Sequence, residues 1–230
     1  MLLHEKHSET YKNPTAAYVA PFLVFIAMMA LERIVPPNQW LYPVRFALVT
    51  LTILTVSRRY ITLRPSNPLG SVAIGILVFV IWVAPDVLFG PGYRHHWLFE
   101  NSLTGEALST VSPALRRNVP FIAMRMVSCA ALVPILEELF WRGWLMRWLI
   151  DKDFEHVPLG MYAPSAFWMV AVLFASEHGP YWEVGLLAGI VYNWWMVRRR
   201  NLADCIWAHA VTNGILSVYV LVTGKWEYWL

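Results

Sequence analysis

The chain has 230 residues, of which 58% are hydrophobic and only 14% are charged, and its formal net charge is +3. Soluble domains carry about 45–50% apolar and about 25% charged residues, so this composition excludes an ordinary soluble domain and points to lipid as the main solvent. The few basic residues do not form a run interleaved with exposed aromatic residues, which argues against a nucleic-acid partner. The sequence therefore predicts an integral membrane protein whose partner is the lipid bilayer.

Apolar stretches along the chain predict about seven membrane-spanning helices, with six to eight as the range. The run LGSVAIGILVFVIWVAP, residues 69–85, has no charge and approaches the length that crosses a bilayer. The predicted spans are Ala16–Leu31, Leu41–Ser57, Leu69–Phe89, Val119–Ile150, Ala163–His178, Tyr181–Val197 and Leu202–Val222. We expect an all-α polytopic transmembrane bundle that forms a single membrane-embedded domain over residues 1–230, with a candidate surface helix in the polar connection 90–118.

The basic residues divide unequally between the two sides of such a bundle, ten against six. One side carries Lys6, Lys12, Arg58, Arg59, Arg64, Arg147, Lys152, Arg198, Arg199 and Arg200. The other side carries Arg33, Arg45, Arg94, Arg116, Arg117 and Lys225. Because Lys and Arg are enriched in cytoplasmic loops, this bias predicts a cytoplasmic N terminus.

The stretch PILEELFWRG places two acids and an arginine inside an apolar span. An ionised carboxylate at the bilayer centre costs at least about 2.5–3.5 kcal/mol on insertion scales, so such groups usually have a partner or a function. On a helix, Glu138 and Arg142 share a face at i, i+4 and can neutralise each other. Glu137 points about 100° away from Glu138 and lacks that arginine. The simpler alternative is an ion pair that packs helices, with one spare acid.

Polar residues of two later spans are predicted at a similar membrane depth. LFASEHG ends a span at His178, and WAHAVTNG places His209 and Asn213 on one helical face. With a rise of 1.5 Å per residue, Glu137 and His178 lie about 20 and 22 Å from one end of the bundle. His209 and Asn213 lie about 10 and 16 Å from the same end. Taken singly, His178 could be an interfacial histidine. His209 and Asn213 could simply hydrogen-bond to neighbouring helices, an interaction that stabilises membrane proteins by about 0.6 kcal/mol on average. Together the four predict a site.

Two other acids near His178 are not expected in this site. Glu177 and Glu183 sit beside a turn, where water is near. In the predicted cavity a carboxylate and a histidine can serve as general base and acid to activate water. A second histidine and an amide can donate hydrogen bonds to a developing oxyanion. These roles suffice for hydrolysis of a peptide bond within a membrane.

Three motifs carry a resemblance to a known family. EELFWR, FASEH and HAVTN resemble the EExxxR, FxxxH and HxxxN motifs of the CAAX-protease and bacteriocin-processing family of intramembrane endopeptidases, and they occur in the family's order. The resemblance covers the motif-bearing helices in residues 119–222, while the first three spans carry no signature. Size and layout are also similar to the CAAX-protease-related branch associated with exosortase systems.

The resemblance implies a role for each residue of the three motifs. Glu137 would activate water together with His178, while His209 and Asn213 would form an oxyanion hole. Glu138 and Arg142 would hold the first glutamate in place, and Phe174 completes the second motif as a supporting residue. A metal-free mechanism without a cofactor is favoured. The alternative is a zinc ion held by the set Glu137, His178 and His209.

The substrate implied by the resemblance is a membrane-associated protein or peptide. Whether it is prenylated, and on which side the cavity opens, are left open by the sequence. The implied location is the bacterial cytoplasmic membrane. Two alternatives remain: a proton-coupled transporter, since buried acids and histidines relay protons, and a non-catalytic immunity or scaffold member of the family.

Overall fold

The computed structural model describes residues 14–35, 41–90 and 92–229. Within these residues all extended regular structure is helical, apart from one isolated β-bridge between Asn101 and Gly105. The predicted fold class, an all-α polytopic bundle, is confirmed. Lys6 and Lys12 of the predicted cytoplasmic charge set lie outside the described residues.

Each of the seven predicted spans is a helix or a helical series. The helices are α1 (Pro14–Ile34), α2 (Leu41–Thr52), α3 (Pro68–Phe89), α4 (Val119–Val127), α5 (Val133–Glu138), α6 (Met146–Trp148), α7 (Pro164–Ser176), α8 (Trp182–Arg199) and α9 (Leu202–Thr223). Five segments are long and apolar enough to cross a membrane, namely Pro14–Glu32, Leu41–Tyr60, Pro68–Phe89, Val119–Trp148 and Leu202–Thr223. α7 is a shorter apolar helix.

The fourth predicted span is a continuous helical rod of 30 residues, Val119–Trp148. Within it, α4, α5 and α6 are joined by two π-helical stretches, Ser128–Leu132 and Leu139–Leu145. The second stretch follows directly after the two glutamates and contains Arg142. Because π-helical turns inside α-helices occur frequently at functional sites, this irregularity coincides with the predicted chemistry.

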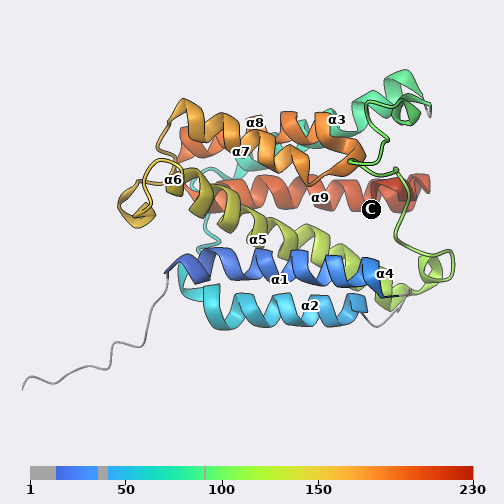
Figure 1. Ribbon diagram of the computed structural model, residues 1–230, viewed down its shortest axis with the longest axis horizontal. Coiled ribbons are helices and arrows are strands. Elements are labelled where there is room, and N and C mark those ends of the chain that lie inside the picture. The colour runs from blue at the N-terminus through green and yellow to red at the C-terminus, as the bar shows by residue number, and fades with distance from the viewer. Residues whose placement is uncertain (1–13, 36–40, 91, 230) are drawn as a thin grey trace, which may run out of the picture.

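The helices are arranged in three layers along the long axis of the molecule, as Figure 1 shows. α1 packs on α2 at one side, the rod and α9 occupy the middle, and α7 packs on α8 at the opposite side. α3 packs on both α8 and α9. A Cβ at Gly75 of α3 would lie only 2.5 Å from the carbonyl oxygen of Ala208 in α9, so glycine permits this close approach.

Asparagine side chains fix where several of these helices begin. Asn67 accepts a hydrogen bond from the Gly70 amide at the start of α3, and Asn118 accepts one from the Phe121 amide at the start of α4. α9 begins in the same way, after Asn201. Each side chain satisfies an amide that has no partner within its own helix.

The connections gather at two opposite ends of the bundle (Figure 1). One end carries the start of α1 and the connection 149–163, and the other carries the long connection 90–118 and the end of α9. The candidate surface helix in residues 90–118 is wrong for the described part of that connection, which contains only the 3-10 turns Tyr93–His95 and Leu115–Arg117. Turns and side-chain hydrogen bonds, such as those of Asn101, satisfy its backbone instead.

Candidate active site

The two neighbouring glutamates of the rod face different surroundings. Glu138 is fully buried, and its Oε1 accepts a hydrogen bond from Arg142 at 3.1 Å. This is the i, i+4 ion pair that the sequence predicts. Glu137 is 7% exposed and lines a cavity of about 230 Å³. The rod thus turns one acid inward to an arginine and the other toward an open space.

Arg142 has partners on several sides although it is fully buried. Its Nε donates to Oδ1 of Asn193 at 2.9 Å, and one terminal nitrogen donates to the carbonyl oxygen of Gly189 at 3.4 Å. The amide of Asn193 in turn donates to the carbonyl oxygen of Phe167 at 2.8 Å. The guanidinium lies 4.5 Å above the ring of Phe174, so its charge also contacts an aromatic face. These contacts tie the rod to α7 and α8.

Both ring nitrogens of His209 point at carboxylates. Its Nδ1 lies 2.9 Å from Oε1 of Glu138, and its Nε2 lies 4.0 Å from Oε2 of Glu137. The ring stacks on Tyr192 at 5.1 Å between centroids. In the contacts of this structure the Glu138–Arg142 pair holds His209, whereas the family resemblance implied that the pair holds Glu137.

His178 lies in the turn between α7 and α8. Its Nδ1 is 2.6 Å from the carbonyl oxygen of Phe174, one helical turn earlier, so we assign the proton to Nδ1 as the donor. The ring packs on Phe174 and Trp82, at 4.6 and 5.1 Å between centroids. A Cβ at Gly185 of α8 would lie 3.1 Å from Nδ1, so this glycine leaves room for the imidazole. Packing therefore fixes the ring and leaves Nε2 for chemistry.

The structure brings the four predicted site residues to one place. Glu137, His178, His209 and Asn213 all line the same cavity. The amide nitrogen of Asn213 donates to the carbonyl oxygen of Cys129 at 3.0 Å, and this side chain is half-buried. Phe174 lines the cavity as well and lies beneath both His178 and Arg142.

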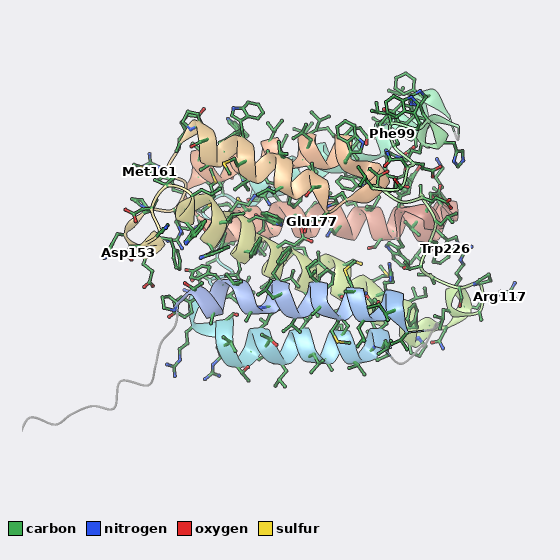
Figure 2. All side chains as sticks on the ribbon, viewed as in Figure 1. Phe99, Arg117, Asp153, Met161, Glu177 and Trp226 are labelled. Carbon is green, nitrogen blue, oxygen red and sulfur yellow. The ribbon has the colours of Figure 1, made fainter. Side chains whose placement is uncertain are left out.

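A further acid, Glu177, lines the cavity. The sequence analysis expected it outside the site, because it sits beside a turn. Its Oε1 accepts a hydrogen bond from Nε1 of Trp141 at 2.9 Å. Figure 2 shows Glu177 near the middle of the bundle. The sequence feature that could have placed Glu177 in the site is its position directly before His178. Glu183, by contrast, lies outside this cavity lining and pairs with Arg94 at 2.8 Å.

The zinc alternative finds no ligand set in the residues that the structure describes. Among them, no three His, Cys, Asp or Glu side chains are placed to hold a metal ion together. Nδ1 of His209 contacts Glu138 and Nδ1 of His178 contacts a backbone carbonyl, so only Nε2 of each ring is left for a metal ion. The zinc alternative stays a prediction that a chelator experiment tests.

Fold and site together define a membrane-embedded helical protein with an acid, two imidazoles and an amide around one internal cavity. Residues 119–215 match the model of a protein family described as type II CAAX prenyl endopeptidase, Rce1-like. The resemblance predicted from the three motifs is confirmed over this segment, which runs from the start of α4 into α9 and contains every predicted site residue. The match supports the general class of intramembrane protease. No curated protein and no solved structure matches the chain.

Proposed function

We propose that this protein is an intramembrane endopeptidase that hydrolyses a peptide bond of a membrane-associated protein in the bacterial cytoplasmic membrane. The observation that carries the proposal is the shared cavity of about 230 Å³, which is lined by Glu137, His178, His209 and Asn213. These side chains come from the rod, from the turn between α7 and α8, and from α9, all within the matched region. Their chemistry supplies a base, an acid and oxyanion donors, which is what peptide hydrolysis by water needs.

Glu137 and His178 activate the water molecule in this proposal. Oε2 of Glu137 is buried and accepts no hydrogen bond from the described residues, so it can accept a proton from water bound in the cavity. His178 presents Nε2 because Nδ1 is bound to the Phe174 carbonyl. Both groups line the cavity, so a water molecule held between them can be deprotonated as it attacks the substrate carbonyl carbon.

His209 and Asn213 stabilise the oxyanion that forms when water adds to the carbonyl. For Nε2 of His209 to donate, both ring nitrogens must carry protons. Glu138 at Nδ1 and Glu137 at Nε2 are the counter-charges that this imidazolium needs. Asn213 uses one amide hydrogen on the Cys129 carbonyl and has a second for the oxyanion. When the C–N bond breaks, the proton taken from water passes to the leaving amine.

The test is a comparison of cleavage products in membranes that contain wild-type, Glu137→Gln or Glu155→Gln protein. Glutamine keeps the size of the side chain but removes the base, and Glu155 is an exposed carboxylate in the connection 149–163 that serves as the matched control. Mass spectrometry of newly formed peptide ends should find cleavage with wild-type and Glu155→Gln protein and none with Glu137→Gln protein. Equal amounts of each protein in the membrane show that insertion is unaffected. Full cleavage by Glu137→Gln would end the glutamate mechanism.

The same substrate separates the proposal from its alternatives. Activity that persists in a strong chelator supports water activation by Glu137, whereas reversible loss and recovery with added zinc supports the metal alternative. A transporter or a non-catalytic scaffold would produce no difference in peptide ends between wild-type and Glu137→Gln membranes.

A further inference from the structure

The cavity occupies only one half of the two central helical segments. On the rod its lining residues run from Arg125 to Glu137, and none comes from the remaining part, Glu138–Trp148. On α9 they run from His209 to Ser217, and none comes from the first seven residues. The rod begins, and α9 ends, at the end of the bundle that carries the connection 90–118 (Figure 1). Both segments thus wall the cavity only toward that end.

The four other helices that line the cavity show the same restriction. α1 contributes only from Phe25 onward and α3 only from Val78 onward, and both run toward the end with the connection 90–118. α7 contributes Phe174 near its last turn, while α8, which runs the opposite way, contributes nothing after Tyr192. The side-chain lining therefore extends from the Glu137 level toward one end only.

The opposite direction is blocked by fully buried polar groups. Glu138, Arg142 and Asn193 lie directly behind the cavity and are each 0% exposed. Closer to that end, Asp204 is also fully buried and accepts hydrogen bonds from Ser66, among others. These buried, hydrogen-bonded groups therefore separate the cavity from that end of the bundle.

The mouth of the cavity is covered by a short segment after α9, residues 224–229, which we call the tail. α9 ends at Thr223, and the next residue, Gly224, has a φ of 70° in the left-handed region that glycine tolerates. Tyr228 and Trp229 line the cavity. The Tyr228 hydroxyl donates to Oδ2 of Asp86 at 2.7 Å, and the Trp229 carbonyl accepts from the Thr110 amide at 3.1 Å. The tail thus rests on the cavity through a few polar contacts at one end of the bundle.

The two ends differ in basic residues. The blocked end carries the larger set, including Arg198–Arg200 at the end of α8 and the pair Arg58 and Arg59 after α2. Among the residues that the structure describes, eight Lys and Arg lie toward the blocked end and six toward the mouth. Because Lys and Arg near the ends of spans are enriched on the cytoplasmic side, this bias favours a cytoplasmic blocked end and a non-cytoplasmic mouth.

We propose that the catalytic cavity opens under the tail at the non-cytoplasmic face, and that the substrate is an extracytoplasmic segment of a membrane-anchored protein, cleaved close to the bilayer. The substrate part of this inference rests on the proposed protease function. The opening of the cavity does not, because it follows from the lining residues and the charge distribution.

Sealed membrane vesicles and a charged, membrane-impermeant methanethiosulfonate reagent test the opening. Cys129 lines the cavity and is half-buried, whereas Cys205 is fully buried and serves as the unreactive internal reference. Two side markers are made in a Cys129→Ala background: Leu103→Cys, at a position that is 95% exposed in the connection 90–118, and Lys152→Cys at the other end. We expect right-side-out vesicles to label Cys129 and Leu103→Cys, and inverted vesicles to label Lys152→Cys.

Removing the ring of Trp229, which lines the cavity, sharpens this result. Trp229→Ala should raise the labelling rate of Cys129 about tenfold in right-side-out vesicles and leave the rate of Leu103→Cys unchanged. The proposal is overturned if Leu103→Cys is labelled only in inverted vesicles, if Cys129 is labelled only from the side of Lys152→Cys, or if Cys129 stays unreactive even in Trp229→Ala.

Labelling needs no catalysis, so the Glu137→Gln protein should be labelled like the wild type. If labelling follows the expected pattern but no peptide ends differ between these two proteins, the protease function fails and the outward opening stands. If cleavage occurs, the cut bond is mapped onto the topology of the substrate. A cut on the extracytoplasmic side supports the substrate class, and a cut on the cytoplasmic side overturns it.

Discussion

The site consists of a floor and a wall that differ in how their charged groups are paired. In the floor, Glu138, Arg142 and Asn193 are completely buried, and Oε1 of Glu138 contacts both Arg142 and His209. In the wall, which is the set of side chains that line the cavity, Glu137 keeps Oε2 without a hydrogen-bond donor from the described residues, and Glu177 is exposed. The comparison indicates that the paired buried charges fix the geometry, while the incompletely paired groups face the substrate.

The largest expected loss of stability comes from breaking the floor. Arg142→Met removes the cation and leaves the fully buried Glu138 without it, which should lower the free energy of unfolding by about 3–5 kcal/mol. Thermal unfolding in detergent measures this loss. Arg198→Met, at an exposed position at the end of α8, is the matched control and should change little.

A second variant shows whether that loss comes from unpaired charge. The double variant Glu138→Gln with Arg142→Met removes both charges, so it should recover part of the lost stability while remaining poorly active because His209 has lost its counter-charge. A double variant that is no more stable than Arg142→Met alone would contradict the pairing.

Substitutions in the wall of the cavity should reduce activity and leave the free energy of unfolding nearly unchanged. Asn213→Ala removes one proposed oxyanion donor, and the loss of such a donor typically lowers kcat about 100- to 1,000-fold. The KM for the substrate should change little, because the oxyanion exists only after the attack. A rise in KM with unchanged kcat would show that Asn213 binds substrate and does not stabilise the oxyanion.

Gly185 of α8 packs against His178 in the wall of the cavity. A Cβ at this position would approach Nδ1 of His178 to 3.1 Å, so Gly185→Ala should displace the imidazole. Misplacement of a catalytic group by about 1 Å can cost about 100-fold in rate, and overpacking costs about 1–3 kcal/mol of stability. Kinetics and thermal unfolding of the same sample separate the two effects. Unchanged kcat would show that the ring position at His178 is not critical.

The smallest effect on stability and kinetics is expected at the hydrogen bond between Trp141 and Glu177. Trp141→Phe keeps an aromatic ring but removes the donor to Glu177, and a typical hydrogen bond inside a protein contributes about 0.5–1.5 kcal/mol to stability. Because Glu177 is exposed to the cavity, we expect the low end of that range in unfolding measurements and a severalfold change in KM. An unchanged KM would place Glu177 outside substrate binding.

The sequence predicted the helices and the principal residues because both leave local signals. Long apolar runs mark α1, α3 and α9, and the i, i+4 spacing of Glu138 and Arg142 fixes a shared face on any helix. Three short motifs then identified the residues that meet in the cavity. These features depend only on residues close together in the chain.

Other features depend on how distant helices rotate toward each other, which spacing alone does not fix. The contact of Glu138 with His209 joins residues 71 positions apart, and the contact of Arg142 with Asn193 joins residues 51 apart. Asn193 did leave a signal, a single amide in an apolar helix, but many helices carry one. The π-helical stretch after Glu138 also changes which faces the following residues present.

The role of Glu137 as the base is tested most directly by the kcat of purified protein in lipid vesicles, measured on one identified substrate in the presence of a chelator. Glu137→Gln should lower kcat by about 100- to 10,000-fold, as expected when the base that activates water is removed, while Glu155→Gln should match the wild type. Equal kcat values for Glu137→Gln and wild-type protein would show that Glu137 does not activate the water molecule.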